Sequence, residues 1–333
     1  MSKEQHQHRK DEHLSLAVKF WGQLEQSQSF SKIRLLPNAL PEIALSEVDI
    51  SRELFGRRFA SPFYIEAMTG GTAKTDTINA QLAEIAKNQN LAMAVGSQSI
   101  ALKYPELAAG FAQVRELNPN GFIFANLGAG HSLEDAERAV DMLQADALEL
   151  HINAAQELTM REGEGDRSFY WLDNIHEIAS KLDVPVVVKE VGFGMAEQTF
   201  QQLEETAVAA INVGGTGGTD FAWIESHRGG RQLLDNYGLS TEDSLRQAKA
   251  NTKPLIATGG IDSAQKVLYA QLLGARLASS AGFVLFNLVK KGPDYLETLL
   301  MDWKSDLVKL YALIGARRPE DLKRGLKSVI IDL

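Results

Sequence analysis

Eight short apolar runs recur through the middle of the chain, and they limit the possible folds more than any other feature. Each run is followed by a glycine-rich or polar turn and then by a stretch with helical periodicity, as at 76–88, 132–144 and 263–273. Eight strand–helix units in about 220 residues predict an α/β fold, a (β/α)8 TIM barrel, which typically takes ~250 residues. The runs span residues 61–67, 91–96, 121–128, 147–153, 184–190, 207–215, 254–260 and 276–282.

The chain is predicted to form one structural domain with three parts. Residues 1–60 are an N-terminal extension with a helix-like stretch at 14–21, residues 61–292 are the barrel, and residues 293–333 close the chain as one or two amphipathic helices. An open, doubly wound sheet is the structural alternative. That fold needs a switch point and a glycine fingerprint after its first strand, and the sequence shows neither.

Composition excludes several classes of protein. The net charge is −9 and no dense basic run is present, which argues against nucleic-acid binding. The absence of cysteine excludes disulfides, thiolate metal sites and cysteine nucleophiles. The N-terminus is polar, without the apolar core of a signal peptide, and no apolar run approaches the ~20 residues that span a bilayer. We therefore expect a soluble cytoplasmic protein that does not bind membranes.

Polar residues and glycines gather at the ends of the predicted strands, where a barrel of this kind carries its active site. Glycine-rich segments at 214–219 and 258–260, and the pair Ala281-Gly282, follow the last three strands. Such loops commonly hold a phosphate with backbone N–H groups, because glycine lets the backbone approach closely. The alternative is that these glycines only form tight turns.

Lys189 ends an apolar strand, where burial without a partner would be costly. A cation beside the pyrimidine part of a flavin would stabilise the anionic reduced ring. A pairing of Lys189 with Glu190 or a neighbouring strand is the structural alternative. Thr69, Ser97 and Asn126 end the first three strands and suit a polar ring edge or a ribityl chain, although each side chain alone is also typical of a helix cap.

The motif His151-x-Asn153-x-x-Gln156-Glu157 ends the fourth strand and begins the next helix. On a strand, His151 and Asn153 point the same way. A carboxylate beside a diphosphate requires a divalent cation between them, and Mg²⁺ often bridges one carboxylate to phosphate. This predicts Glu157 as a metal ligand, with Asn153 and Gln156 as polar support. The alternative is a carboxylate favoured by the helix dipole.

Arg9, Lys10 and His13 form a cationic cluster near the N-terminus. From composition alone, an unstructured polar tail is the favoured interpretation. His227 and Arg228 follow the long glycine loop and either face the site or line a solvated helix.

Taken together, these motifs resemble one family, the type 2 isopentenyl-diphosphate isomerases. The combination of the His151–Glu157 motif with VVVKEVGFGM is highly specific, and the resemblance runs from Arg9 to about residue 322. The matching segments are Arg9-Lys10-x-x-His13, Met68-Thr69-Gly70-Gly71, Gly96-Ser97-Gln98, Ala125-Asn126-Leu127-Gly128, His151–Glu157, GDRSF at 165–169, VVVKEVGFGM at 186–195 and GGTGGT at 214–219.

The resemblance implies an FMN enzyme that interconverts isopentenyl and dimethylallyl diphosphates. Reduced FMN acts as the acid and base, Mg²⁺ is required, and NADPH serves as the reductant. Of the residues below, the resemblance makes His151, Gln156 and Lys189 catalytic, and it implies a homo-oligomer, a tetramer or an octamer. It assigns Arg9, Lys10, His13, His151, Asn153 and Gln156 to the substrate, Glu157 to the metal, and Ala67, Met68, Thr69, Ser97, Asn126, Lys189, Thr219, Gly259, Gly260, Ile261, Ala281 and Gly282 to FMN.

This sequence departs from the family pattern at two positions. Some members carry an arginine shortly after the Gly-Ser pair as a diphosphate contact, but here Gln98 and Ser99 follow Ser97. Phe221 stands where some members have tryptophan. The arginine contact is therefore absent or supplied from elsewhere.

Two other functions remain as alternatives. FMN-dependent 2-hydroxy-acid oxidases use a similar barrel and a motif like the HRGGRQ segment at 227–232, although their histidine lies at a strand end. Here His227 comes about eight residues after the glycine loop that occupies that position. The third possibility is a barrel that binds a phosphorylated ligand without catalysis.

Overall fold

The computed structural model describes residues 2–23, 29–31, 33–36, 38–165, 167–234, 237–324 and 330–332. Asp166, in the predicted 165–169 motif, lies outside the described residues. Within them, no helix combines the length and the apolar character that crossing a lipid bilayer requires.

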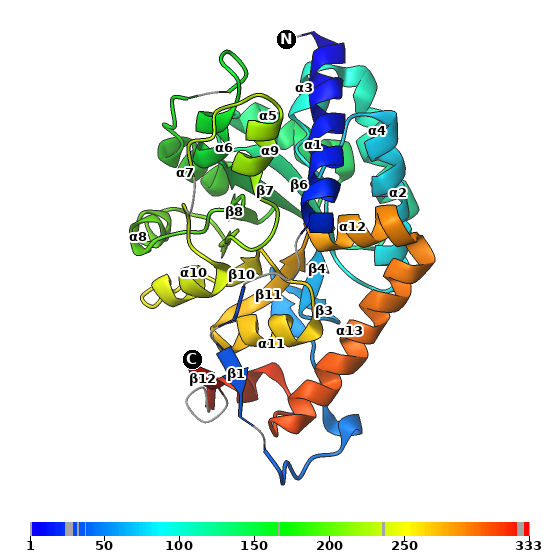
Figure 1. Cartoon of the computed structure of the whole chain (residues 1–333), viewed down its shortest axis with the longest axis vertical. Helices are drawn as coiled ribbons and strands as arrows, with labels where there is room; N and C mark the ends of the chain where they lie inside the picture. The colour runs from blue at the N-terminus through cyan, green and yellow to red at the C-terminus, as the bar shows by residue number, and fades with distance from the viewer. Residues whose placement is uncertain are drawn as a thin grey trace.

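Eight parallel strands form a closed barrel, as the apolar runs predict (Figure 1). The last barrel strand pairs with the first, with Ala278 opposite Phe63 and Ser280 opposite Ile65. Each strand lies within or beside its predicted run, and most are shorter because their ends turn into loops. In chain order they are β4 (Phe63–Ile65), β5 (Met93–Ala94), β6 (Ile123–Gly128), β7 (Ala147–Ile152), β8 (Val186–Glu190), β9 (Ala210–Asn212), β10 (Leu255–Thr258) and β11 (Ala275–Ser280).

Helices follow the strands and cover the outside of the barrel (Figure 1). Several begin at a side-chain cap, since Thr72, Ser132, Asp220, Ser240 and Ser263 each accept a hydrogen bond from an amide of the first turn. The helices are α2 (Ala73–Asn88), α3 (Ser99–Lys103), α4 (Ala108–Leu117), α5 (Leu133–Leu143), α6 (Ala154–Thr159), α7 (Leu172–Lys181), α8 (Glu197–Glu204), α9 (Phe221–His227), α10 (Thr241–Gln247), α11 (Ala264–Leu272) and α12 (Gly282–Lys291).

The inside of the barrel is apolar at one end and polar at the other. A hairpin of β2 (Arg52–Leu54) and β3 (Arg57–Phe59) closes the end where the strands begin, and the ring of Phe59 lies 4.9 Å from that of Phe122. Above them, Tyr64 stacks on Phe124 at 5.0 Å. Near the ends of the strands the interior holds buried polar side chains instead: Glu66, Asn126, Glu149, Lys189, Asn212, Thr258 and Ser279.

Two terminal elements lie outside the strand–helix repeat. The helix α1 (Lys3–Gln23) contains the predicted stretch at 14–21 but begins much earlier, so the tail suggested by composition is wrong. The helix packs against α9 and α12 (Figure 1). The ring of its buried residue Trp21 lies 6.0 Å from that of Phe283. Packing explains the difference, because a polar helix that docks on a barrel carries only a narrow apolar stripe.

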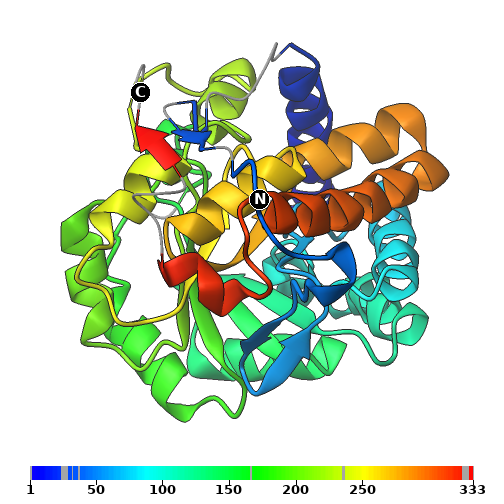
Figure 2. The ribbon, with the colours of Figure 1, turned by 90° about the horizontal axis from the view of Figure 1, so that it is seen from below.

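The C-terminal part of the chain, 293–333, contains the predicted helical structure and also a strand that was not predicted. The chain ends in α13 (Pro293–Leu313), a 3₁₀ helix η3 (Pro319–Arg324) and a strand β12 (Ile330–Asp332). This strand pairs antiparallel with β1 (Ile33–Leu35), and the two lie side by side in Figure 2. The wholly helical prediction for 293–333 is therefore wrong at its end, because pairing with a segment about 300 residues away leaves no local signal.

The apolar floor of the barrel should dominate stability. Phe124 is fully buried among aromatic rings, so Phe124→Ala should lower the free energy of unfolding by ~3–5 kcal/mol, measured by urea denaturation and circular dichroism. Leu313→Ala, at a position 45% exposed, is the control and should cost about 0.5 kcal/mol or less. Equal losses for both variants would contradict the assignment of the core.

Candidate active site

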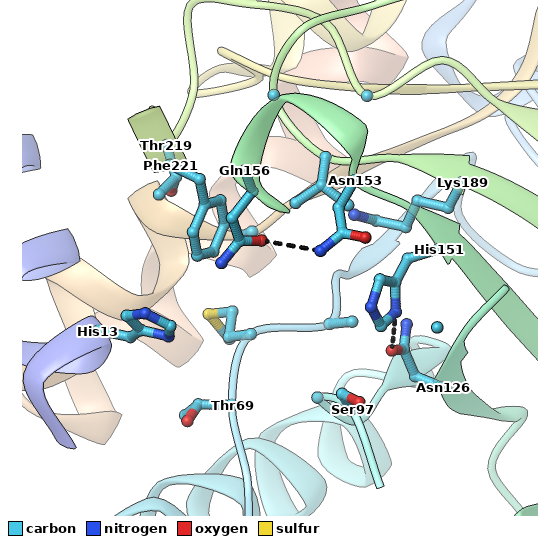
Figure 3. Close-up of a pocket in the computed structure, with 18 of the residues that line it drawn as sticks. His13, Thr69, Ser97, Asn126, His151, Asn153, Gln156, Lys189, Thr219 and Phe221 are labelled. Atoms are coloured by element: carbon cyan, nitrogen blue, oxygen red, sulfur yellow. Dashed lines mark hydrogen bonds between the residues drawn. The ribbon is translucent and has the colours of Figure 1, made fainter. Parts of the chain in front are cut away.

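One cavity of about 660 Å³ opens at the carboxyl ends of the strands. Side chains from α1 line one side, and side chains from the strand ends and the loops after them line the other (Figure 3). Every predicted site residue lines this one cavity: Arg9, Lys10, His13, Ala67, Met68, Thr69, Ser97, Asn126, His151, Asn153, Gln156, Glu157, Lys189, Thr219, Gly259, Gly260, Ile261, Ala281 and Gly282.

The wall formed by the last strands and β4 has the features of a ligand cradle. Gly259 has φ +110°, and a Cβ there would lie 2.0 Å from the Gly215 carbonyl oxygen, so this close turn requires glycine. The N-cap of α12, Ala281, offers no side-chain cap, which leaves the first amides of that helix to a ligand. The Thr69 hydroxyl is buried and has no hydrogen-bond partner among the described residues. These features fit a phosphate and a polar ring.

Lys189 and His151 lie on neighbouring strands in the floor of the cavity (Figure 3). Lys189 is 6% exposed and its Nζ donates to the Glu190 backbone oxygen at 3.4 Å. The Glu190 carboxylate instead accepts from the amides of Phe193 (2.6 Å) and Gly194 (2.9 Å), which disfavours the predicted alternative of a Lys189–Glu190 ion pair.

His151 is neutral in this environment. Burial, and then the charge of Lys189, lower the pKa of His151 to about 3. Its Nδ1 lies 3.0 Å from Asn126 Oδ1. A ring held in this way orients a ligand through hydrogen bonds, not through charge.

Arg9 and Lys10 bring two neighbouring cations to the cavity from α1. Lys10 Nζ donates to the Ser97 backbone oxygen at 3.1 Å, and Arg9 Nε is buried without a hydrogen-bond partner among the described residues. Burial, and then the charge of Arg9, lower the pKa of Lys10 to about 8. Two half-buried cations that have no carboxylate partner among the described residues are costly, and an anionic ligand would remove that cost.

Glu157 lines the cavity in the first turn of α6. Asn153 Nδ2 donates to Glu157 Oε1 at 2.9 Å and to Gln156 Oε1 at 3.3 Å (Figure 3). The described part of the chain holds no group of three or more His, Asp or Glu side chains suited to a metal. Glu157 therefore offers one carboxylate, a number that suits Mg²⁺ completed by phosphate and water.

Glu225 and Arg228 support the site. The sequence did not indicate Glu225, and it left open whether Arg228 faces the site. Glu225 is fully buried and contacts His13 Nε2 at 2.8 Å, Gln156 Nε2 at 3.2 Å and Arg228 Nη1 at 2.5 Å. Burial alone would raise the pKa of Glu225, but hydrogen bonding by His13 and the charge of Arg228 outweigh it and set the pKa at about 2. Glu225 therefore ties α1 to α6 and orients Gln156.

His227, in contrast, is exposed and stacks on the Trp223 ring at 3.8 Å between centroids. It does not take the strand-end position that the oxidase motif requires. The HRGGRQ motif points to His227, but the neighbouring Glu225 is the residue that contacts the cavity side chains His13 and Gln156, and Arg228 contacts Glu225.

A second missed feature is a chain of side chains in the cavity wall beside α3. The Ser97 and Ser99 hydroxyls lie 2.9 Å apart, Ser99 Oγ lies 2.8 Å from His131 Nε2, and His131 Nδ1 lies 2.9 Å from Asp135 Oδ2. This chain begins where the family pattern expects an arginine. No sequence signal identifies it, since its partners come from α3, α5 and the loop before α5.

Comparison with known proteins agrees with this geometry. The chain matches the FMN-dependent dehydrogenase family over residues 17–109 and 106–328. It is 60% identical over 328 residues to the isopentenyl-diphosphate delta-isomerase of Lactococcus lactis subsp. lactis (strain IL1403), covering 97% of this chain and 94% of that one. It is 46% identical to the isopentenyl-diphosphate delta-isomerase of Latilactobacillus sakei subsp. sakei (strain 23K), covering 93% and 89%.

Solved structures share the fold at low sequence identity. A flavocytochrome b2 variant aligns with a TM-score of 0.69 and 18% identity, covering 91% of this chain and 77% of that chain. A mandelate oxidase variant aligns with a TM-score of 0.64 and 16% identity, covering 94% and 89%. These two matches confirm the barrel, while the near-complete alignment to relatives of much higher identity decides the family: the chain belongs to the isopentenyl-diphosphate delta-isomerases.

Proposed function

We propose that this protein interconverts isopentenyl and dimethylallyl diphosphates in isoprenoid biosynthesis. The proposal includes reduced FMN, Mg²⁺ and NADPH as the reductant, in a cytoplasmic homo-oligomer. One observation carries it: Arg9 and Lys10, two cations with no carboxylate partner among the residues that the structure describes, share a single cavity with a glycine-lined cradle and Lys189. That arrangement suits a diphosphate on the α1 side and a flavin on the strand side.

The residues of the cradle fit FMN. The open N-terminus of α12 and the turn at Gly259 suit its phosphate, Thr69 offers the unpartnered hydroxyl to the ring or the ribityl chain, and Lys189 offers a cation to the pyrimidine part. When bound in reduced form, FMN supplies the acid and base for the shift of the double bond.

The chain itself binds, orients and shields the substrate. Arg9 and Lys10 hold the diphosphate, and Gln156, held by Glu225, faces the same cavity with the neutral ring of His151. The helix α1 forms the remaining wall, and Leu14 and Ala17 in that wall present an apolar surface. Protonation of an alkene creates a cationic centre that water would quench, so an apolar wall protects the reaction.

An anaerobic isomerisation assay tests the function directly. Purified protein with FMN, NADPH and Mg²⁺ should convert isopentenyl diphosphate to dimethylallyl diphosphate, followed by product analysis, and product should be absent when the flavin stays oxidised. Oxygen uptake with lactate or glycolate would favour the oxidase instead. If the protein binds a phosphorylated ligand but shows no turnover under reducing conditions, the alternative of a non-catalytic binding protein would be favoured.

The affinity for diphosphate should fall as the pH rises through about 8. The pKa of Lys10 is lowered to about 8, so the amine is a cation below this pH and becomes neutral above it. Loss of one charged contact corresponds to about tenfold weaker binding. Calorimetry with inorganic diphosphate, from pH 6.5 to 9.5, measures the change.

Lys10→Arg is the matched control, because arginine keeps its charge over this range. Diphosphate gains charge as the pH rises, so the comparison between wild type and Lys10→Arg isolates the lysine. Parallel pH profiles for the two proteins would contradict the role of Lys10.

Glu157→Gln should weaken the dependence on Mg²⁺ without releasing FMN. Glu157 is the carboxylate that we assign to the metal, and a neutral amide binds Mg²⁺ poorly. We expect the Mg²⁺ concentration for half-maximal activity to rise by about tenfold or more. Glu162→Gln, at an exposed position of the same segment, should change nothing. An unaltered Mg²⁺ titration for Glu157→Gln would remove this residue from the metal site.

A further inference from the structure

Two buried carboxyl groups, Glu66 and Glu149, lie beneath the cavity and play no part in the function proposed above. Both are fully buried. Glu66 directly follows β4, and Glu149 lies on β7. Tyr64 lies between them, with its hydroxyl 3.2 Å from Glu66 Oε2 and 3.0 Å from Glu149 Oε1. Five groups lie within hydrogen-bond distance of Glu66: Tyr64 Oη, Asn212 Nδ2 (2.8 Å), Thr258 Oγ1 (3.0 Å), Ser279 Oγ (2.6 Å) and the Ala67 amide (2.7 Å).

Counting hydrogens limits how the two carboxyl groups can be charged. A tyrosine hydroxyl carries one hydrogen and donates to one carboxyl group only. Glu66 Oε2 also lies within hydrogen-bond distance of Asn212, Thr258 and Ser279. Because the Thr258 and Ser279 hydroxyls also contact each other, these three groups supply at least two hydrogens to Glu66, which suits a carboxylate. If Tyr64 donates to Glu66, the 3.0 Å contact with Glu149 needs a hydrogen on Glu149 Oε1. Glu149 Oε2 is then a carbonyl oxygen, which accepts from Asn126 Nδ2 at 3.1 Å.

We infer that Glu66 and Glu149 share one proton, held on Glu149, and that the remaining carboxylate charge on Glu66 is the buried counter-ion of Lys189. The two glutamates are thus positioning residues for the floor of the cavity. Nothing in this arrangement requires either group to touch a ligand.

The electrostatics of the pair agree with the hydrogen count. Burial, and then the charge of Glu66, raise the pKa of Glu149 well above its ordinary value. Burial alone would also raise the pKa of Glu66, but the charge of Lys189 and hydrogen bonds from Ser279 and the Ala67 amide lower it. One buried cation and one buried anion therefore balance each other, which removes most of the cost of an isolated charge.

The same network fixes the ring of His151 above it. Asn126 uses Nδ2 for Glu149, so its Oδ1 faces His151 and accepts from Nδ1–H. The free Nε2 of the neutral ring then points a lone pair toward the cavity. Glu149 therefore sets the tautomer of His151 through Asn126, and His151 can accept a hydrogen bond from a bound ligand.

The proton on the pair is measurable by infrared spectroscopy of the FMN-loaded protein. The C=O stretching band of a protonated carboxyl group lies at a higher frequency than the bands of carboxylates and amides, so it can be recognised separately. We expect Glu149→Gln to lose one such band, and Glu66→Gln to lose one as well, because Glu149 then ionises in place of Glu66. Burial raises the pKa of Glu190 to about 8, but its band is common to all variants and cancels in the difference spectra.

The counter-ion is measured through the flavin potential, and this part rests on the proposed function. Each single variant keeps one negative charge, so the potential at pH 6 should match that of wild type. The double variant, Glu66→Gln with Glu149→Gln, loses the charge, which favours the anionic reduced flavin. The ratio of reduced to oxidised flavin at a fixed dye potential should then rise by on the order of tenfold.

The alternatives give different patterns. Two ionised glutamates would show no band to lose, and each single variant would raise the potential. Two neutral glutamates would leave the potential of the double variant unchanged. If the double variant does not fold, Lys189→Met replaces it: removal of the cation should add a second acid band under our inference and none if both groups are already neutral. Failure of FMN to bind would overturn the proposed function, while the infrared bands would still decide the proton.

Discussion

Pairing of β11 with β4 closes the sheet, and the site depends on this closure. The contact between Ala278 and Phe63 joins strands about 215 residues apart in sequence and removes every free edge from the sheet. Because all eight strands run parallel, their carboxyl ends lie on one side, and closure arranges them in a ring. Residues that are far apart in sequence, such as Thr69 and Gly282, therefore line the same cavity.

A closed barrel of eight strands has an interior just wide enough for side chains, which constrains what lies beneath the cavity. Its apolar half, around Phe124, needs only packing. Its polar half must carry Lys189 without solvent, and a buried amine is tolerated only with compensating charge and hydrogen bonds. The compensating charge is the carboxylate of Glu66, which lies within hydrogen-bond distance of five polar groups. The polarity of the site thus reaches one layer deeper than the residues that a ligand touches.

The sequence predicts the barrel well because its signals are local and repeated. A short apolar run recurs in every unit, and glycine at strand ends and caps such as Ser132 recur in several. The cavity residues at strand ends follow from the same rule. Glu66 and Glu149 escaped notice because each lies at or within an apolar run, where a single carboxylate seems incidental, and its partners come from other strands.

Contacts between distant segments explain the other omissions. The three-residue strands β1 and β12 are defined by each other and carry no pattern long enough to read. The helix α1 is polar over its first half, and only the barrel surface shows which side of it is buried. Composition predicted a tail at Arg9 and Lys10 for this reason. The resemblance to a family assigned both residues to the substrate, and both line the cavity.

The way α1 docks explains how an acidic protein presents cations to a ligand. Its apolar contacts, including Trp21, lie in the C-terminal half, on α12. Its N-terminal half is held by polar contacts, such as Thr72 with Asp11 at 2.8 Å and Arg228 with Glu12 at 3.0 Å. Asp11 and Glu12, the acidic residues next to the cations, are thereby engaged with the barrel, and Arg9 and Lys10 face the cavity. A local positive field inside a chain of net charge −9 follows from this division of contacts along one helix.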